Sequence, residues 1–375
     1  MFKYITQRIA FAILTLFIIT FVVFILVSVF GQNPIKAIVE KELANPKNKH
    51  TYEELILENE IIFGLRYADG TPIPIFVRYF IYIGNVFSGD FGFIINKENN
   101  PSPSEYTNIQ LLFFTPLKYS IRITLPAFIV SSISGITIGV FAGYKRGKLF
   151  DSGANLFVLI FVAVPSFVLA PILITISLKI GIPTTVPRDA LEPSFGELFI
   201  SYLPPVLIIT LTSMAVYVSY TRNQVITVLT SNYVLIAKTK GLKPTQIFFK
   251  YVLRNISIPL FSLLFGSFLG LLSGSIIIEK YWDVPGTSQV IARSFPTGEI
   301  NIIMFSTIFF TGLALASSIF VDVMFAVLDP KITYAAKNKK NYWLFFKAFL
   351  ERRKLEKDLY LKRQLEKQNQ LGQQS

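Results

Sequence analysis

The sequence predicts an all-α membrane protein with about six transmembrane helices, and three observations carry this prediction. Hydrophobic residues make up 52% of the chain and charged residues only 16%, against about 25% in soluble domains. The apolar residues fall into long runs that are almost free of charge. Each run exceeds the roughly 20 residues that a helix needs to cross a hydrocarbon core about 30 Å thick. The runs cover residues 9–30, 123–144, 156–178, 198–220, 256–278 and 302–328.

The composition excludes several broad classes of protein. A typical soluble enzyme carries more charge, and a disordered chain is poor in large apolar residues. The chain contains no cysteine, which excludes disulfides, a thiolate metal site and a cysteine nucleophile. The first run follows Lys3 and Arg8 and lacks a small-residue cleavage site, so we expect a retained anchor and not a signal peptide. Prolines inside the third and fourth runs are compatible with kinked, packed membrane helices.

The distribution of Lys and Arg predicts the orientation. The loop after the second run carries three of these residues and the loop at 221–255 carries six, whereas the loops after the third and fifth runs carry one and two. Loops rich in Lys and Arg face the cytoplasm, so we expect both termini to be cytoplasmic. The tail agrees, because residues 331–375 hold twelve Lys or Arg and four Asp or Glu. That is +8 of the net charge of +13.

The orientation divides the chain into four predicted parts. They are an N-terminal transmembrane helix at 1–30, an extracytoplasmic loop region at 31–118, a five-helix core at 119–330 with a cytoplasmic loop at 221–255, and a basic cytoplasmic tail at 331–375. Within the loop region, residues 73–95 are apolar but too interrupted to span, so we expect an interfacial or re-entrant element. His50 is the only histidine and is expected at the surface.

Small residues recur at every fourth position in two of the runs. The rows are Ser131, Gly135, Gly139 and Gly143 in the second run, and Ser262, Gly266, Gly270 and Gly274 in the fifth. This spacing places each row on one helical face, where glycine lets another backbone approach closely. Two interpretations stay open: the rows pack the bundle tightly, or they form smooth faces along a moving translocation pathway.

The cytoplasmic loop at 221–255 carries the most informative pattern. Residues 232–241 predict a short helix that ends at Gly241, and a second helix is expected to begin near Pro244. The chain is then expected to return to the membrane at Pro259. A basic, helical loop on the cytoplasmic side is suited to docking a soluble partner.

This loop resembles the coupling loop of binding-protein-dependent ABC importer permeases. In that family an Ala-x-x-x-Gly core is followed at a fixed distance by an apolar-x-apolar-Pro motif. Ala237 and Gly241 match the core, and Ile256, Ile258 and Pro259 match the second motif. The fourteen residues between the two matches are similar to the peptide and nickel branch of the family.

Further segments resemble the same branch, in the same order along residues 1–332. They are Tyr4-Ile5 with Arg8-Ile9, Gly89-Asp90-Phe91-Gly92, Ala163-Val164-Pro165-Ser166-Phe167, Glu279 with Trp282 and Pro285-Gly286, and Asp322 with Asp329-Pro330-Lys331-Ile332. The ordered set is most similar to the first (B-type) subunit of oligopeptide permeases. Leu235 stands where many such permeases have Glu, so the contact of that carboxylate is not carried over.

The resemblance implies a type I ABC importer permease fold and a place in the plasma membrane of a bacterium. It implies a subunit that forms half of a pathway for oligopeptides, beside a second homologous permease, two ATPase subunits and an extracytoplasmic peptide-binding lipoprotein. The sequence contains no Gly-x-x-x-x-Gly-Lys-Ser/Thr loop, so ATP is expected to be used by the partner subunits and no cofactor is expected in this chain. Membrane lipid is an expected partner and nucleic acid is not.

The resemblance also implies three groups of site residues and no catalytic or metal-binding residue. The ATPase-coupling group is Tyr233, Ala237, Lys238, Thr239, Lys240, Gly241, Arg254 and Pro259; the pathway or helix-packing group is Gly135, Gly139, Gly143, Gly266, Gly270 and Gly274; the extracytoplasmic group is Gly89, Asp90, Glu279, Trp282, Pro285 and Gly286.

Other functions remain as alternatives. A dipeptide or nickel permease would share the same motifs, although the sequence shows no His-rich or thiolate metal site. An intramembrane enzyme is the alternative from another class, because Asp322 lies in an apolar run. That enzyme would need a second intramembrane acid or a serine paired with histidine, so we expect Asp322 to be a structural partner. The tail, with its aromatic residues before a charged run, suits either an anionic lipid surface or an ATPase.

Overall fold

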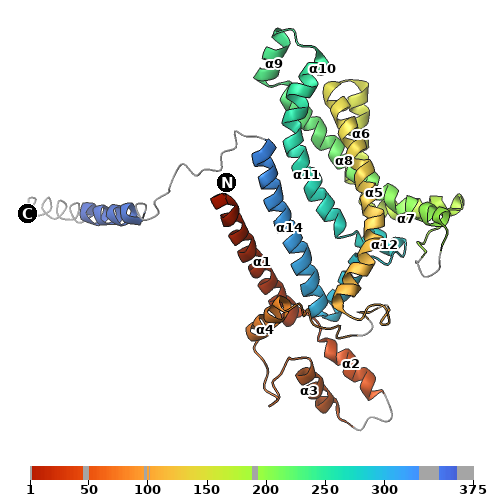
Figure 1. The fold of residues 1–375 in the computed structure, drawn as a ribbon, viewed down its shortest axis with the longest axis vertical. Helices are drawn as coiled ribbons and strands as arrows, with labels where there is room; N and C mark the ends of the chain where they lie inside the picture. The colour runs from red at the N-terminus through yellow and green to blue at the C-terminus, as the bar shows by residue number, and fades with distance from the viewer. Residues whose placement is uncertain are drawn as a thin grey trace, which may run out of the picture.

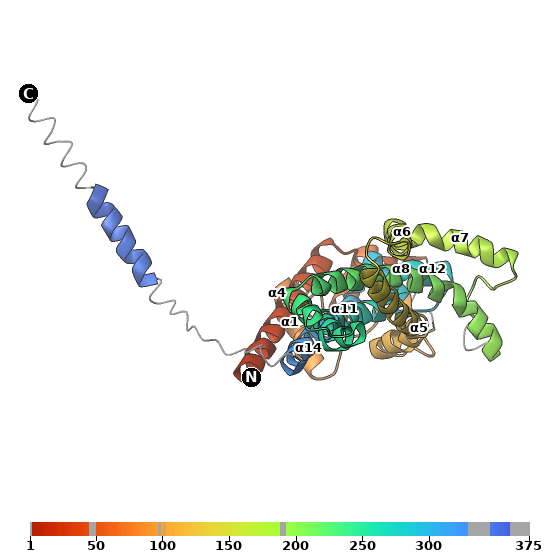
Figure 2. The same ribbon diagram turned by 90° about the horizontal axis from the view of Figure 1, so that it is seen from above.

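The computed structural model describes residues 2–44, 50–96, 99–100, 102–187, 193–328 and 346–360. Throughout these residues the regular elements are helices, and the only β pairing among them is an isolated bridge between Arg66 and Pro72. The predicted all-α class is therefore confirmed. Figure 1 shows the long helices running lengthwise, and in Figure 2 the helix of residues 346–360 stands away from them. Our interpretations of residues 329–345 and 361–375 lie outside the described residues.

Five helices are long and apolar enough to cross a membrane. They are α1 (Phe2–Phe30), α5 (Ile109–Tyr144), α8 (Phe195–Leu229), α11 (Arg254–Leu272) and α14 (Ile300–Leu328). Each contains most of one predicted run, so five of the expected spans are confirmed as helices. The helix α5 begins well before its run, at Ile109, because the Asn108 side chain accepts the N–H of Leu111 and caps the helix there.

The third predicted run is not a single kinked helix, and that expectation was wrong. The chain forms α6 (Leu149–Ala163) and α7 (Ser166–Lys179), which are bent by 100° relative to each other. Val164 is extended between them, as a residue before proline usually is, and Pro165 has no N–H to continue the α6 ladder. Figure 2 shows α7 directed away from the other long helices.

The helices α5, α6 and α8 pack through small residues. Ala142 of α5, Ala154 of α6 and Val218 of α8 form a buried cluster. Along the same seam, a Cβ added to Gly139 would lie 2.7 Å from the Cβ of Thr221. The backbones of α5 and α8 therefore approach as closely as glycine allows, which is the packing expected of small residues on a membrane helix.

The chain between α11 and α14 folds back in two short helices. These are α12 (Ile276–Tyr281) and α13 (Thr287–Thr297). Ile278, Trp282 and Val284 are buried against Ile123 of α5 and Ile208 of α8. The fifth predicted run therefore ends as a membrane helix at Leu272, and its last residues belong to this re-entrant turn.

The segment between α1 and α5 holds three helices. They are α2 (Pro34–Leu43), α3 (Tyr52–Ile62) and α4 (Ile75–Phe87). The apolar helix α4 is too short to span a bilayer, as the sequence predicts. It packs against α1, where the Tyr79 hydroxyl lies 2.9 Å from Thr20 Oγ1. In Figure 1 the helices α2 and α3 lie at the end of the molecule opposite α9.

Candidate functional site

The loop between α8 and α11 forms a helical segment that we call the coupling segment, residues 230–253. A two-residue link joins α8 to α9 (Asn232–Thr239), and α10 (Pro244–Ile247) follows. Gly241 ends the first helix with a φ of +74°, a left-handed conformation that favours glycine. The predicted short helix, glycine stop and helix start at Pro244 are all present.

A π-helix, η3 (Phe248–Leu253), joins α10 directly to α11. The chain thus re-enters the bundle as one continuous helical path from Pro244, and Pro259 lies inside α11 instead of marking its start. The predicted return at Pro259 is corrected in this respect. A packed membrane helix tolerates the proline because neighbouring groups compensate for the missing hydrogen bond.

An apolar core beneath the coupling segment holds it on the bundle. Val234 and Ala237 of α9 are buried, and so are Val252 of η3 and Ile256 of α11. They pack with Val225 of α8 in one cluster. Since the cluster includes residues before, within and after the segment, a force applied to α9 reaches both α8 and α11 through packed side chains.

The outer face of α9 is exposed, and the other side chains of the predicted coupling group lie on or near it. Tyr233, Leu235 and Ile236 are exposed apolar residues, and Lys238 and Lys240 are exposed cations. Figure 1 places α9 at one tip of the molecule. Exposed apolar side chains next to basic ones on a protruding helix form a surface suited to a protein partner.

An ion pair that our sequence analysis missed lies behind the coupling segment. Arg222 of α8 donates to Asp151 of α6 through Nε at 2.5 Å and Nη2 at 2.8 Å. Asp151 Oδ2 also accepts the N–H of Gly147 at 2.9 Å, and Oδ1 accepts Asn155 Nδ2 at 3.2 Å. The carboxylate is almost fully buried, with 5% of the side chain exposed. The sequence signal was an acidic residue beside a basic turn, which we counted only as charge.

Glu279 forms a buried hub at the opposite end of the bundle. Its carboxylate accepts Ser120 Oγ at 2.7 Å and Ser288 Oγ. Gly274, with a φ of +77°, and Gly286 each lie so close that an added Cβ would collide with this carboxylate. The hub therefore joins α5, α12 and α13, and it needs both glycines. Trp282 is fully buried beside it and Pro285 is half-buried.

The predicted extracytoplasmic residues do not form one cluster. Gly89 and Asp90 lie in an exposed turn after α4, where Asp90 Oδ1 accepts the N–H of Gly92 at 2.8 Å. The chain that follows is held by Glu299, which our sequence analysis also missed. Glu299 accepts the N–H of Ile95 at 3.1 Å, the N–H of Asn96 and Asn99 Nδ2 at 3.1 Å.

Burial raises the pKa of the Glu299 carboxyl, and the N–H donors of Asn96, Asn99 and Ile95 act in the opposite direction. The carboxyl group lies in the turn between α13 and α14 and is fully buried. It therefore ties residues 95–99 to the start of α14.

The two glycine rows differ from each other. Gly135, Gly139 and Gly143 face α8 in the tight seam. Gly266 and Gly270 have no atom within 4 Å of an added Cβ and are exposed. The prediction of one continuous row on the fifth span is wrong at Gly274, which lies beyond the end of α11 in a left-handed conformation.

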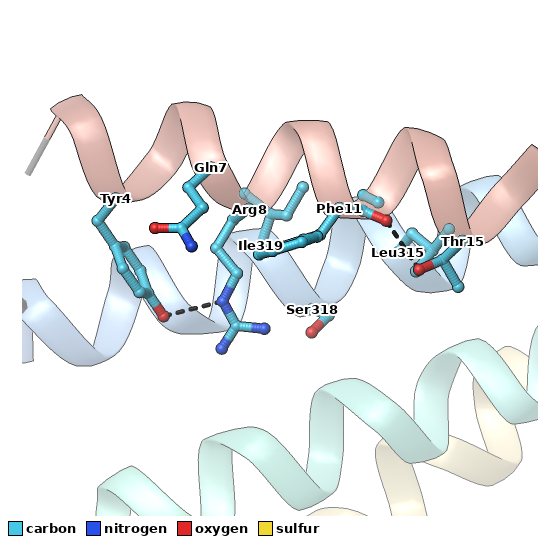
Figure 3. Close-up of a pocket in the computed structure, with 9 residues that line it drawn as sticks. Tyr4, Gln7, Arg8, Phe11, Thr15, Leu315, Ser318 and Ile319 are labelled. Carbon is cyan, nitrogen blue, oxygen red and sulfur yellow. Dashed lines mark hydrogen bonds between the residues drawn. The ribbon is translucent and has the colours of Figure 1, made fainter. Parts of the chain in front are cut away.

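A third polar contact joins α1 to α14. Arg8 Nη2 lies 2.9 Å from Asp322 Oδ2, so the expected structural role of Asp322 is supported by an ion pair. The pair borders a cavity of about 370 Å³ between the two helices. Figure 3 shows Tyr4 and Arg8 pointing into it from α1, with Ser318 on α14. The described residues contain no cluster of His, Cys, Asp and Glu that could hold a metal ion.

An all-helical multi-pass membrane protein with a protruding helical segment on a packed core has the features of a transporter permease. The chain belongs to the family described as "Binding-protein-dependent transport system inner membrane component", whose model matches residues 135–334. It is thus a multi-pass permease subunit of an ABC transporter, and its family places it in a complex with other subunits. The glycine seam, the coupling segment and the Glu279 hub all lie within the matched region.

Curated relatives match nearly the whole chain. The oligopeptide transport system permease protein OppB of Mycoplasma genitalium is 30% identical over 92% of this chain and 80% of that protein. The dipeptide transport system permease protein DppB of Lactococcus lactis is 28% identical over 88% of this chain and 99% of that protein. A solved structure titled "Crystal structure of an amino acid ABC transporter with histidines" aligns at 13% identity over 56% of this chain and 92% of that one, with a TM-score of 0.43.

Proposed function

We propose that this chain forms half of the translocation pathway of an ATP-driven importer of oligopeptides. The observation that carries the proposal is the coupling segment, whose α9 exposes an apolar and basic face while its inner face is locked onto α8 and α11. The similarity to oligopeptide permeases over most of the chain supports the substrate class.

In this proposal α9 and both termini face the cytoplasm. The support is the count of Lys and Arg in the loops, since the turn at 145–148 and the coupling segment are both basic. Each of two ATPase subunits receives a coupling segment, one from this chain and one from a second homologous permease. ATP is bound and hydrolysed by those subunits and not by this chain.

On the opposite side of the membrane, a peptide-binding lipoprotein delivers the substrate. The surfaces offered to it are the helices α2 and α3 and the turn that contains Asp283, which are exposed at that end of the bundle. The Glu279 hub and the Glu299 contacts hold these surfaces in fixed positions relative to α5 and α14.

Replacement of Gly241 tests the proposal. A valine at this position would be a β-branched residue with a φ of +74°, which costs on the order of 1–3 kcal/mol locally. An added Cβ at Gly241 meets no atom within 4 Å, so the strain comes from the backbone alone. We expect the Gly241→Val complex to assemble, to lose most peptide uptake and to hydrolyse ATP without responding to peptide.

Gly153→Val is the matched control. Gly153 also has no atom within 4 Å of an added Cβ, but it has ordinary helical φ in α6. The experiment reconstitutes the complex in vesicles and measures peptide uptake and ATP hydrolysis on the same preparation. Normal uptake by Gly241→Val would contradict the role of the coupling segment. A wild-type complex that imports no oligopeptide would contradict the proposed substrate class.

A further inference from the structure

The seam between α5 and α8 has little to prevent one helix from sliding along the other. Helices usually interlock by placing side chains of one between those of the next. Here α5 presents Gly135, Gly139 and Gly143 to α8, and the neighbouring buried contact consists of Ala142, Ala154 and Val218. Glycine has no side chain to insert, so shape alone fixes the axial position of α8 only weakly.

The Asp151–Arg222 ion pair lies beside this smooth seam. The guanidinium holds both carboxylate oxygens, a bidentate geometry that is directional as well as strong. Gly147 N–H and Asn155 Nδ2 hold the same carboxylate from the α5–α6 turn and from α6. A displacement of α8 by one turn, about 5.4 Å, would break both hydrogen bonds of the pair.

Buried ion pairs contribute little net stability, and their best-attested role is to fix the register between elements. The position of Arg222 gives such a register a consequence. It lies two turns before the end of α8 at Leu229, and α9 begins after a link of only two residues. The Cβ of Gly143 would also lie 3.2 Å from the carbonyl oxygen of Arg222, so the ion pair and the smooth seam share the same stretch of α8.

We propose that Asp151 and Arg222 are positioning residues that fix the register of α8 against α5 and α6, so that α9, α8, α6 and α5 move as one body. Without the pair, a push on α9 slides α8 along the glycine row, and the movement does not reach the rest of the pathway. This inference rests on the proposed coupling of α9 to an ATPase, and it assigns the step that follows.

The decisive experiment measures peptide imported per ATP hydrolysed by the full complex in vesicles. Asp151→Asn and Arg222→Gln should each leave the complex assembled and lower this ratio at least about fivefold, the lower end of ordinary coupling between sites. The double variant with Asp151→Arg and Arg222→Asp restores an ion pair of reversed polarity and should recover most of the ratio. Arg146→Gln is the matched control, because it removes an exposed charge from the same turn and should change nothing.

Two results would overturn the proposal. One is an unchanged ratio in assembled Asp151→Asn and Arg222→Gln complexes. The other is a reversed pair that behaves no better than the single variants, whether these fail in assembly or in transport. A purely structural pair would lower the amount of complex and leave the ratio of the surviving complex intact.

A distance measurement separates this inference from the proposed function. The chain has no cysteine, so spin labels at Leu156→Cys in α6 and Thr239→Cys in α9 are unique within it. Both residues are exposed. With the pair intact, the distance between the labels should stay the same with and without ATP, whatever the substrate. Asp151→Asn should make it depend on the nucleotide, and a distance that varies with ATP in the intact complex would refute the single rigid body.

Discussion

The tight seam between α5 and α8 predicts a sharp difference between two glycines of the same composition and spacing. An added Cβ at Gly139 would lie 2.7 Å from Thr221 Cβ and 2.8 Å from the carbonyl oxygen of Val218. Carbon atoms make favourable contact at about 3.5–4.0 Å. Neither neighbour is the flexible end of a side chain, so the two helices must separate by roughly 1 Å to admit a methyl group.

Overpacking of this kind costs about 1–3 kcal/mol. Gly266 provides the internal standard, because an added Cβ there meets no atom within 4 Å. Both substitutions to alanine gain the same helix propensity, up to about 1 kcal/mol, so the difference between them isolates the seam. We expect Gly139→Ala to be less stable than Gly266→Ala by about 1–3 kcal/mol, which is roughly a 5- to 150-fold change in the unfolding equilibrium.

The assay is thermal or denaturant unfolding of the purified chain in detergent, with the wild type alongside. Equal unfolding midpoints for the two variants would refute the close approach of α5 and α8. The assembled complex adds a second comparison. If the open row of Gly266 and Gly270 meets the second permease, Gly270→Ala should be harmless in the isolated chain and should slow substrate-stimulated ATP hydrolysis in the complex; weakened assembly with normal activity per surviving complex would instead assign this row to static packing.

Two further predictions concern acidic residues. Burial raises the pKa of Glu299, so its stabilising contribution is present below the ordinary carboxyl pKa and is lost as pH rises through the raised value; cleavage of residues 88–108 by an added protease should therefore slow as pH falls from 8 to 5, and less so in Glu299→Gln. Asp322→Asn should retain peptide uptake, because its partner Arg8 is 44% exposed and such a pair contributes on the order of 1 kcal/mol or less. An intramembrane enzyme that depends on Asp322 would lose its activity instead.

Long-range order in this fold was readable from the sequence because the bilayer enforces it. A span must be apolar over about 20 residues, so five of the six predicted spans coincide with helices. The coupling segment was readable for a local reason, since Gly241 has a positive φ and Pro244 occupies the first turn of α10. The break at Val164 was not predicted, because proline is compatible with both a kink and a complete interruption in a packed membrane helix.

The candidate site was only partly readable because its polar contacts join distant parts of the chain. Asp151 and Arg222 are 71 residues apart, and Asn99 and Glu299 are 200 residues apart. Net charge and spacing carry no information about such pairs. The glycine rows show the same limit, because periodicity predicts which residues share a face but not what faces them. Gly139 and Gly266 are indistinguishable by pattern and opposite in environment.

The π-helix between α10 and α11 gives the spacing between Gly241 and Ile256 a geometric meaning. Its hydrogen bonds run from each residue to the fifth beyond, so the turn holds one more residue than the α-helical turn that it replaces. Removing that residue would restore an α-helix and rotate everything before it by about 100° around the axis of α11. The length of this segment and the compass bearing of α9 are therefore one quantity: a single-residue deletion at 248–253 would turn the exposed face of α9 away from its partner while leaving every motif intact.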